Sequence, residues 1–126
     1  MGDVRSFLDE YAAAFSNYDE DRLVDSFHVP CMMVNSNSAA VLRDLKSVRS
    51  NVQSLLLYHR SERVVSAHIA ELHVESLGRS LAIARVSWSV RRTDLPSWHF
   101  WNTYNLIHTD PSWRVLVSTT HSERSG

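Results

Sequence analysis

Hydrophobic and polar residues alternate along the last third of the chain, which is the spacing that predicts β-strands. Three alternating runs cover residues 81–91, 99–109 and 113–121, and short breaks rich in turn-forming residues separate them. A fourth run, 64–75, precedes them, and Gly78 marks the turn that follows it. Because successive strands joined by short turns usually pair, this part of the chain predicts a four-stranded antiparallel meander.

The first half of the chain has its hydrophobic residues at helical spacing instead. Residues 4–15 place an apolar stripe opposite charged side chains, which predicts an amphipathic helix. Asp19 is a suitable cap for a second, shorter helix. Asp44 is a suitable cap for a third helix that runs to about Arg60. We therefore expect three helices before the meander.

Between the second and third helices the pattern changes at a proline. Pro30 ends helical propagation and favours an extended residue before it. Residues 31–34 are predicted to form a short buried strand, and residues 39–42 return as the second arm of a hairpin. Helices first and a long sheet last indicate an α+β fold in which three N-terminal helices pack in the concave face of a curved, mostly antiparallel sheet. We expect one domain spanning 1–126 with a frayed tail over 122–126.

Composition excludes several classes of protein. With 44% hydrophobic and 21% charged residues, the chain has enough apolar surface to fold. The net charge of −1 provides no field for nucleic acid or anionic lipid, so neither partner is expected. The acidic start and the lack of a long apolar run predict a cytoplasmic protein without a signal peptide or membrane span. The single cysteine, Cys31, fits a reducing compartment.

Several short segments resemble one known superfamily. They are Tyr11-Ala-Ala-Ala-Phe15 followed by Asp19 and Leu23, the sequence Phe27-His28-Val29-Pro30 running into a strand, and Trp113-Arg114-Val115 opening the last strand. In this combination the chain resembles the nuclear-transport-factor-two-like superfamily, which includes ketosteroid isomerases, scytalone dehydratase and SnoaL-like polyketide cyclases. The resemblance covers nearly the whole chain, and it implies a cone-shaped domain with a ligand pocket and a homodimer formed through the outer sheet face.

The resemblance also implies positions for functional residues. Tyr11 matches the first-helix tyrosine that donates to a developing enolate oxygen in the isomerases. Asn35 falls where they place a proton-shuttling carboxylate, and Asn105 falls near their second oxyanion donor. Trp88 lies where a tryptophan lines the pocket. An asparagine amide does not titrate near neutral pH, so an isomerase proton shuttle through Asn35 is not expected, although an asparagine can still donate to an oxyanion.

Strand periodicity predicts the wall of the pocket. Trp88 shares a face with small and aliphatic residues, so that face of 81–91 is predicted to point inward. Both faces of 99–109 are half apolar, which leaves its inward face undecided and fits a core on one side and a subunit partner on the other. The predicted ligand-binding residues are Phe15, Val86, Trp88, Trp101, Thr103 and Asn105.

Histidines supply the remaining chemistry. His28 sits where the second helix meets the first strand, and a histidine titrates near neutrality, so it is a candidate base. A histidine at a helix end is equally explained by the helix dipole. His68 and His73 are five residues apart and are expected on opposite faces of one strand, and no metal-binding motif occurs, so no metal or other cofactor is predicted.

Two functions from different classes follow. The first is a SnoaL-like protein that binds a small apolar carbonyl or hydroxylated ligand with Tyr11 and either His28 or Asn35, with isomerase, lyase or cyclase chemistry left open. The second is a non-catalytic homodimer that uses its sheet as an interaction platform.

Overall fold

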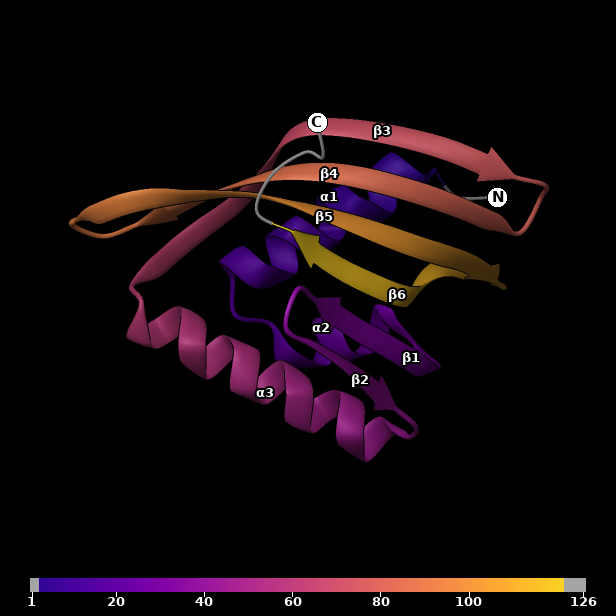
Figure 1. Cartoon of the computed structure of the whole chain (residues 1–126), viewed down its shortest axis with the longest axis horizontal. Helices are drawn as coiled ribbons and strands as arrows, with labels where there is room; N and C mark the ends of the chain where they lie inside the picture. The colour runs from indigo at the N-terminus through magenta and orange to yellow at the C-terminus, as the bar shows by residue number, and fades with distance from the viewer. Residues whose placement is uncertain (1–2, 122–126) are drawn as a thin grey trace.

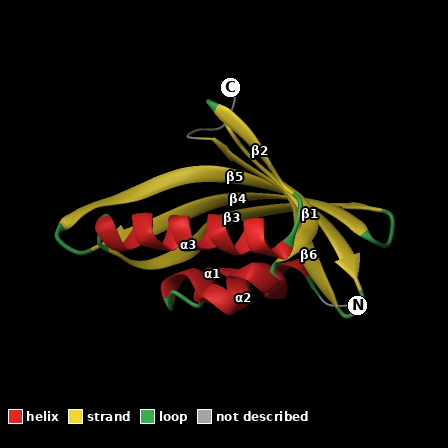
Figure 2. Ribbon diagram, turned by 90° about the horizontal axis from the view of Figure 1, so that it is seen from below, coloured by secondary structure: helices red, strands yellow, loops and turns green. Residues whose placement is uncertain are grey.

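The computed structural model describes residues 3–121, so the tail expected over 122–126 lies outside the described residues. Three helices, α1 (Val4–Ser16), α2 (Glu20–Asp25) and α3 (Leu45–Ser61), lie on one side of a six-stranded sheet (Figure 2). The strands are β1 (Phe27–Asn35), β2 (Ser38–Leu42), β3 (Val64–Leu77), β4 (Leu81–Arg92), β5 (Leu95–Thr109) and β6 (Ser112–His121). The α+β class and the helices in the concave face are confirmed.

The sheet has the order β2-β1-β6-β5-β4-β3 (Figure 1). The predicted meander of β3 to β6 is antiparallel throughout, while β1 pairs with β6 in parallel. This parallel pairing, which the sequence did not predict, joins the small hairpin to the meander in one sheet. In Figure 2, β1 and β2 turn away from the direction of β3 to β5 and rise at one end of the helices. The β1–β2 hairpin therefore lies across one end of the concave face that holds the helices.

An aspartate caps each helix, and the sequence predicted two of the three, Asp19 and Asp44. The side chains of Asp3, Asp19 and Asp44 accept hydrogen bonds from the first turns of α1, α2 and α3. At Asp44 the cap is reciprocal, since Ser47 Oγ also accepts from the Asp44 amide at 3.2 Å. A serine fixes α1 on the sheet, because Ser16 Oγ accepts from the Ala67 amide of β3 at 2.9 Å.

Two boundaries differ from the sequence prediction. β1 begins at Phe27, before the proline, because Phe27 already pairs with Val115 of β6. β5 begins at Leu95 rather than at residue 99, since Leu95 pairs with Arg92 and leaves a two-residue turn. Asp94 takes a left-handed φ of 59° in that turn, which allows the tight reversal. The resulting β4–β5 hairpin extends beyond the other strands at one end of the sheet (Figure 1).

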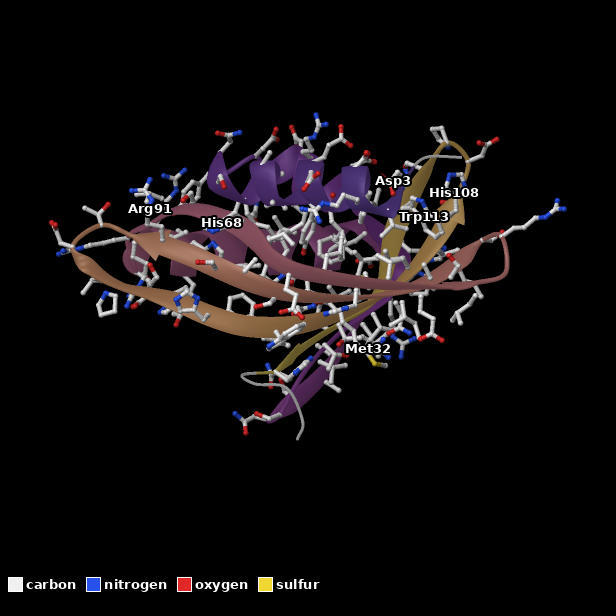
Figure 3. The ribbon with its side chains drawn as sticks, turned by 90° about the horizontal axis from the view of Figure 1, so that it is seen from above. Asp3, Met32, His68, Arg91, His108 and Trp113 are labelled. Carbon is white, nitrogen blue, oxygen red and sulfur yellow. The ribbon has the colours of Figure 1, made fainter. Side chains whose placement is uncertain are left out.

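A bulge in β3 corrects one prediction about the histidines. Ile69 pairs with Trp88 and Glu71 with Ser87, so Ala70 is an extra residue without a partner on β4. One extra residue inverts the alternation, and His68 and His73 therefore face the same, outer side of the sheet rather than opposite sides. Figure 3 shows His68 on this strand, near the end of the sheet that carries Arg91.

The core lies between the inner sheet face and α1. Leu8, Leu23, Val86, Leu106 and Val115 are almost completely buried there. Trp113, near the start of β6, is also buried, with 6% of its surface exposed. It lies at the end of the sheet near Asp3 and the start of α1 (Figure 3). Within residues 3–121, no helix is long and apolar enough to cross a membrane.

Candidate functional site

A cavity of about 590 Å³ opens between α1, α3, the β1–β2 hairpin and the inner sheet face. Its volume is typical of a site for a small organic molecule. Its lining residues are Tyr11 and Phe15 on α1; Met33, Val34, Asn35, Ser38 and Ala40 on the hairpin; Asn51, Ser54, Leu55, Tyr58 and His59 on α3; and Ala67, Trp88, Val90, Trp98, Phe100, Asn102, Tyr104, Ser118 and Thr120 on the sheet.

A chain of hydrogen bonds occupies the deepest part of this cavity. The indole Nε1 of Trp88 donates to the Tyr104 hydroxyl at 3.0 Å. The Tyr11 hydroxyl also hydrogen-bonds to Tyr104, and burial together with this bond raises the pKa of Tyr11 well above its ordinary value. Burial likewise raises the pKa of Tyr104. Both phenols therefore stay protonated at any physiological pH. Because Tyr104 accepts two hydrogen bonds, its own proton can be directed to a third group in the cavity.

An amide forms a second polar group on the same wall. Asn102 is 3% exposed, and its Nδ2 donates to Ser118 Oγ at 3.0 Å. Its Oδ1 accepts from Thr120 Oγ1 at 2.5 Å. The register pairs Asn102 with Thr120 and Tyr104 with Ser118, so these four side chains form one patch across β5 and β6. Asn102 has one further N–H and Ser118 its own O–H, so this patch can donate to a ligand, while its hydroxyl oxygens can also accept.

Aromatic rings form the part of the cavity nearest the β4–β5 hairpin. The rings of Tyr58 and Trp98 stack with centroids 5.7 Å apart. Arg92 lies 4.7 Å from the Trp98 centroid and hydrogen-bonds to Glu62 at 3.0 Å, which fixes this wall to the end of α3. The cavity therefore has flat aromatic surfaces leading to a polar floor.

Sequence reasoning missed His59, among other residues of this wall. His59 lines the cavity, with its ring centroid 5.4 Å from that of Phe15 and 6.2 Å from that of Trp98. Desolvation by burial lowers its pKa below the ordinary value of 6.5, so the imidazole is neutral at pH 7. The signal was present in the sequence, because His59 continues the inward helical series of Val52 and Leu55 at spacings of three and four.

Four of the predicted site residues line this cavity. Tyr11, Phe15 and Trp88 all line it, and Trp88 is 3% exposed and faces the helices, as its strand alternation predicted. Val86 shares that face but is completely buried in the core without lining the cavity. Asn35 lies at the rim, where its Oδ1 accepts from the Asn37 and Ser38 amides at 2.8 and 3.0 Å. Asn35 thus holds the β1–β2 turn.

The placement of the other predicted residues was wrong. Trp101, Thr103 and Asn105 lie on the outer face of β5, because the inward positions of this strand are the alternate residues, Asn102 and Tyr104 among them. Asn105 therefore cannot join Tyr11 in an oxyanion hole.

His28 is also outside the cavity. Its Nδ1 lies 2.9 Å from the Pro30 carbonyl oxygen on the same strand. This local contact within β1 gives His28 no route to a ligand in the cavity.

The charge of the cavity limits the ligand. Among the described lining residues there is no aspartate, glutamate, lysine or arginine. A charged ligand would therefore be desolvated without an opposite charge to compensate. The arrangement fits a neutral, flat molecule that carries an oxygen acceptor for the donors at the floor.

The comparisons with known proteins agree with this architecture. Residues 2–123 match the family described as NTF2-like protein (DUF6841), and the chain belongs to this family. A search of curated proteins found no match.

Solved structures share the fold at low sequence identity. The chain resembles Rv3472 of Mycobacterium tuberculosis, a protein of unknown function whose structure was solved for a single-residue variant, with a TM-score of 0.77 and 15% identity over 97% of this chain and 70% of that one. An NTF-2-like protein of unknown function from Shewanella oneidensis has a TM-score of 0.76 and 10% identity over 93% and 94% of the two chains. An NTF2-like protein with a cystatin-like fold from Novosphingobium aromaticivorans has a TM-score of 0.75 and 12% identity over 98% and 81%. At these identities the likeness is one of fold.

Proposed function

We propose that this protein binds a small, neutral, planar ligand that carries a carbonyl or hydroxyl oxygen. The observation that carries the proposal is the polarity of the cavity, which joins an uncharged aromatic wall to a floor of hydrogen-bond donors. The Tyr104 hydroxyl, the second N–H of Asn102 and the Ser118 hydroxyl can each donate a hydrogen bond to an acceptor. An oxygen on the ligand supplies one, while Trp98 and Phe100 provide flat apolar surface for its ring system.

Binding can be tested with bicyclic probes that carry or lack an oxygen. We expect 2-naphthol and 2-tetralone to quench tryptophan fluorescence saturably, because Trp88 and Trp98 line the cavity. Naphthalene, which has the rings but no oxygen, should bind at least about ten-fold more weakly, the loss expected for about 1.4 kcal/mol of hydrogen bonding. Equal binding of all three would contradict recognition of an oxygen.

A matched pair of variants locates the binding. Ala67 lines the cavity from β3, while Ala70, three residues along the same strand, is exposed. Ala67→Phe should fill cavity volume and abolish saturable quenching, whereas Ala70→Phe should leave it unchanged. Quenching that survives in Ala67→Phe, with the variant folded by circular dichroism, would place the ligand elsewhere.

We also propose that the outer sheet face forms a homodimer, which is the alternative role that the sequence raised. Ile83, Trp101, Ile107 and Val117 are half-buried on the outer sides of β4, β5 and β6. The His73 ring stacks on Trp101 with centroids 6.2 Å apart, which leaves a flat aromatic surface on the sheet. A surface of this kind suits an isologous contact between two copies.

A further inference from the structure

Four histidines gather on the outer face of the sheet, which is the face turned away from the ligand cavity. They are His68 and His73 on β3, His99 on β5 and His121 on β6. Ser89 of β4 pairs with His68 on one side and with His99 on the other, so these two imidazoles flank a single serine. The strand register thus brings together side chains from three strands, and we call the four residues the histidine cluster.

Two members of the histidine cluster lie beside Trp101. The His73 ring stacks on the Trp101 indole with centroids 6.2 Å apart. His121 is the partner of Trp101 on β6, and its Nε2 lies 3.2 Å from Thr103 Oγ1. Trp101 is half-buried and belongs to the surface proposed above for the homodimer. A charge on either imidazole would therefore arise next to an aromatic group at the centre of that contact.

The fixed charges around the histidine cluster balance one another. Over the outer positions of β3 to β5, all of which are described, the charged side chains are Glu71 and Glu75 on β3 and Arg85 and Arg91 on β4. Glu75 and Arg85 pair at 3.8 Å, and the Glu71 carboxylate contacts His73 Nε2. Arg114, at the start of β6, pairs with Asp25 of α2 at 3.5 Å. This face therefore has almost no net charge while its histidines are neutral.

We propose that the histidine cluster makes the homodimer dependent on pH, so that two copies associate at neutral and alkaline pH and separate when the imidazoles become charged. The inference rests on the proposed homodimer and adds its regulation. A histidine side chain gains its positive charge between about pH 8 and pH 5. Once all four are charged, the balanced glutamates and arginines leave each copy with four excess positive charges on this face. An isologous contact places them against the same charges on the partner, which repel.

The direction of the effect follows from proton linkage. Burial between two copies disfavours the charged imidazole, so the separated copies bind protons more readily than the dimer does. The dissociation constant of the dimer should therefore stay constant while the imidazoles are neutral and rise as the pH falls through their titration. This effect differs from acid destabilisation of the fold through His59, because dissociation of a dimer depends on protein concentration and leaves each copy folded.

Analytical ultracentrifugation at pH 8 and pH 5.5 over a series of protein concentrations tests the proposal, with circular dichroism of the same samples to establish that the chain stays folded. We expect the dissociation constant of the wild-type dimer to rise at least about 100-fold between the two pH values, as like charges across a contact require. The double variant His73→Gln/His121→Gln keeps polar side chains beside Trp101 but cannot gain charge there. Its dissociation constant should change no more than about ten-fold over the same range.

A matched pair of variants tests the effect of charge without acid. At pH 8, His121→Arg places a permanent charge beside Trp101 and should weaken the dimer at least about ten-fold, whereas the neutral His121→Gln should leave it intact. A wild-type dimer that persists unchanged at pH 5.5, or an acid dissociation that is equally large in the double variant, would overturn the pH dependence and leave the homodimer standing. A wild type that is monomeric at pH 8 would remove the homodimer and its regulation together.

Discussion

Trp88 and Tyr104 are joined by a hydrogen bond of 3.0 Å across the inner faces of β4 and β5. Both side chains are 3% exposed, and Tyr11 reaches the same hydroxyl from α1. One phenol oxygen thus links the sheet to the first helix at the floor of the cavity. It serves the fold, because it satisfies a buried indole N–H, and it serves the proposed site, because its own proton is available to a ligand.

Replacing Tyr104 with phenylalanine should reveal the structural half of this role. The Trp88 indole N–H would lose its acceptor in the core. We expect the free energy of unfolding to fall by about 1–3 kcal/mol, the usual cost of a buried donor without a partner. Urea denaturation measures this change in the free energy of unfolding. Tyr58→Phe, which removes a hydroxyl from an exposed ring, is the control and should change stability by no more than about 0.5 kcal/mol.

Two asparagines on β5 test which face of the strand lines the cavity. Asn102→Ala would leave the buried Ser118 hydroxyl and the Thr120 hydroxyl without their amide partner, so we expect a loss of about 1–3 kcal/mol in unfolding free energy. Asn105→Ala alters the outer face and should lower the free energy of unfolding by about 0.5 kcal/mol or less. Chemical denaturation of the two variants provides the comparison. A larger loss at Asn105 would contradict the register.

The lowered pKa of His59 predicts a pH dependence of stability. Above pH 6.5 the imidazole is neutral in both the folded and the unfolded chain, so it contributes no pH dependence. Below that pH the unfolded chain binds the proton first, and the free energy of unfolding therefore falls until the pH passes the lower, folded pKa. His59→Phe lacks this contribution, so its stability should drop less between pH 7 and pH 5 than that of the wild type. Urea titrations at both pH values measure the difference, and equal losses in the two proteins would argue against a shifted pKa.

The outer sheet face predicts self-association. Sedimentation at tens of micromolar, an ordinary range for dimer affinity, should give twice the monomer mass. Such a contact should bury at least about 1,000 Å² in total. Trp101→Arg should return the protein to a monomer, because it would place a charge in the centre of the contact. Asp21→Arg makes a charge change of comparable kind on α2, away from the sheet, and should leave the dimer intact. A monomeric wild type would remove the proposal.

Local patterns along the chain were enough to predict the elements. The caps Asp19 and Asp44, the helical spacing of apolar residues and the alternating runs after residue 64 each depend on neighbours close in sequence. Such interactions follow from backbone geometry alone, so they can be recognised before the fold is known. The inward face of β4 was also predictable, because one of its faces carries arginines and serines and the other does not.

Longer-range contacts decided the rest. Both faces of β5 are half apolar, so alternation could not distinguish Asn102 from Asn105, and only the packing of α1 and α3 against the sheet selects the inward one. The unpaired Ala70 inverted the side on which His73 lies, and a bulge of this kind depends on the register with β4.

The sequence by itself therefore determined the helices, the strands and the superfamily, because these depend on short-range periodicity and on recognisable segments. Only the tertiary structure decided the site. It placed His28 outside the cavity and Asn102 inside it. His59 came to lie in a cavity with Tyr104, 45 positions away in the chain. A catalytic or binding group is defined by what surrounds it in space, and desolvation, hydrogen-bond partners and cavity walls exist only once distant segments have packed together.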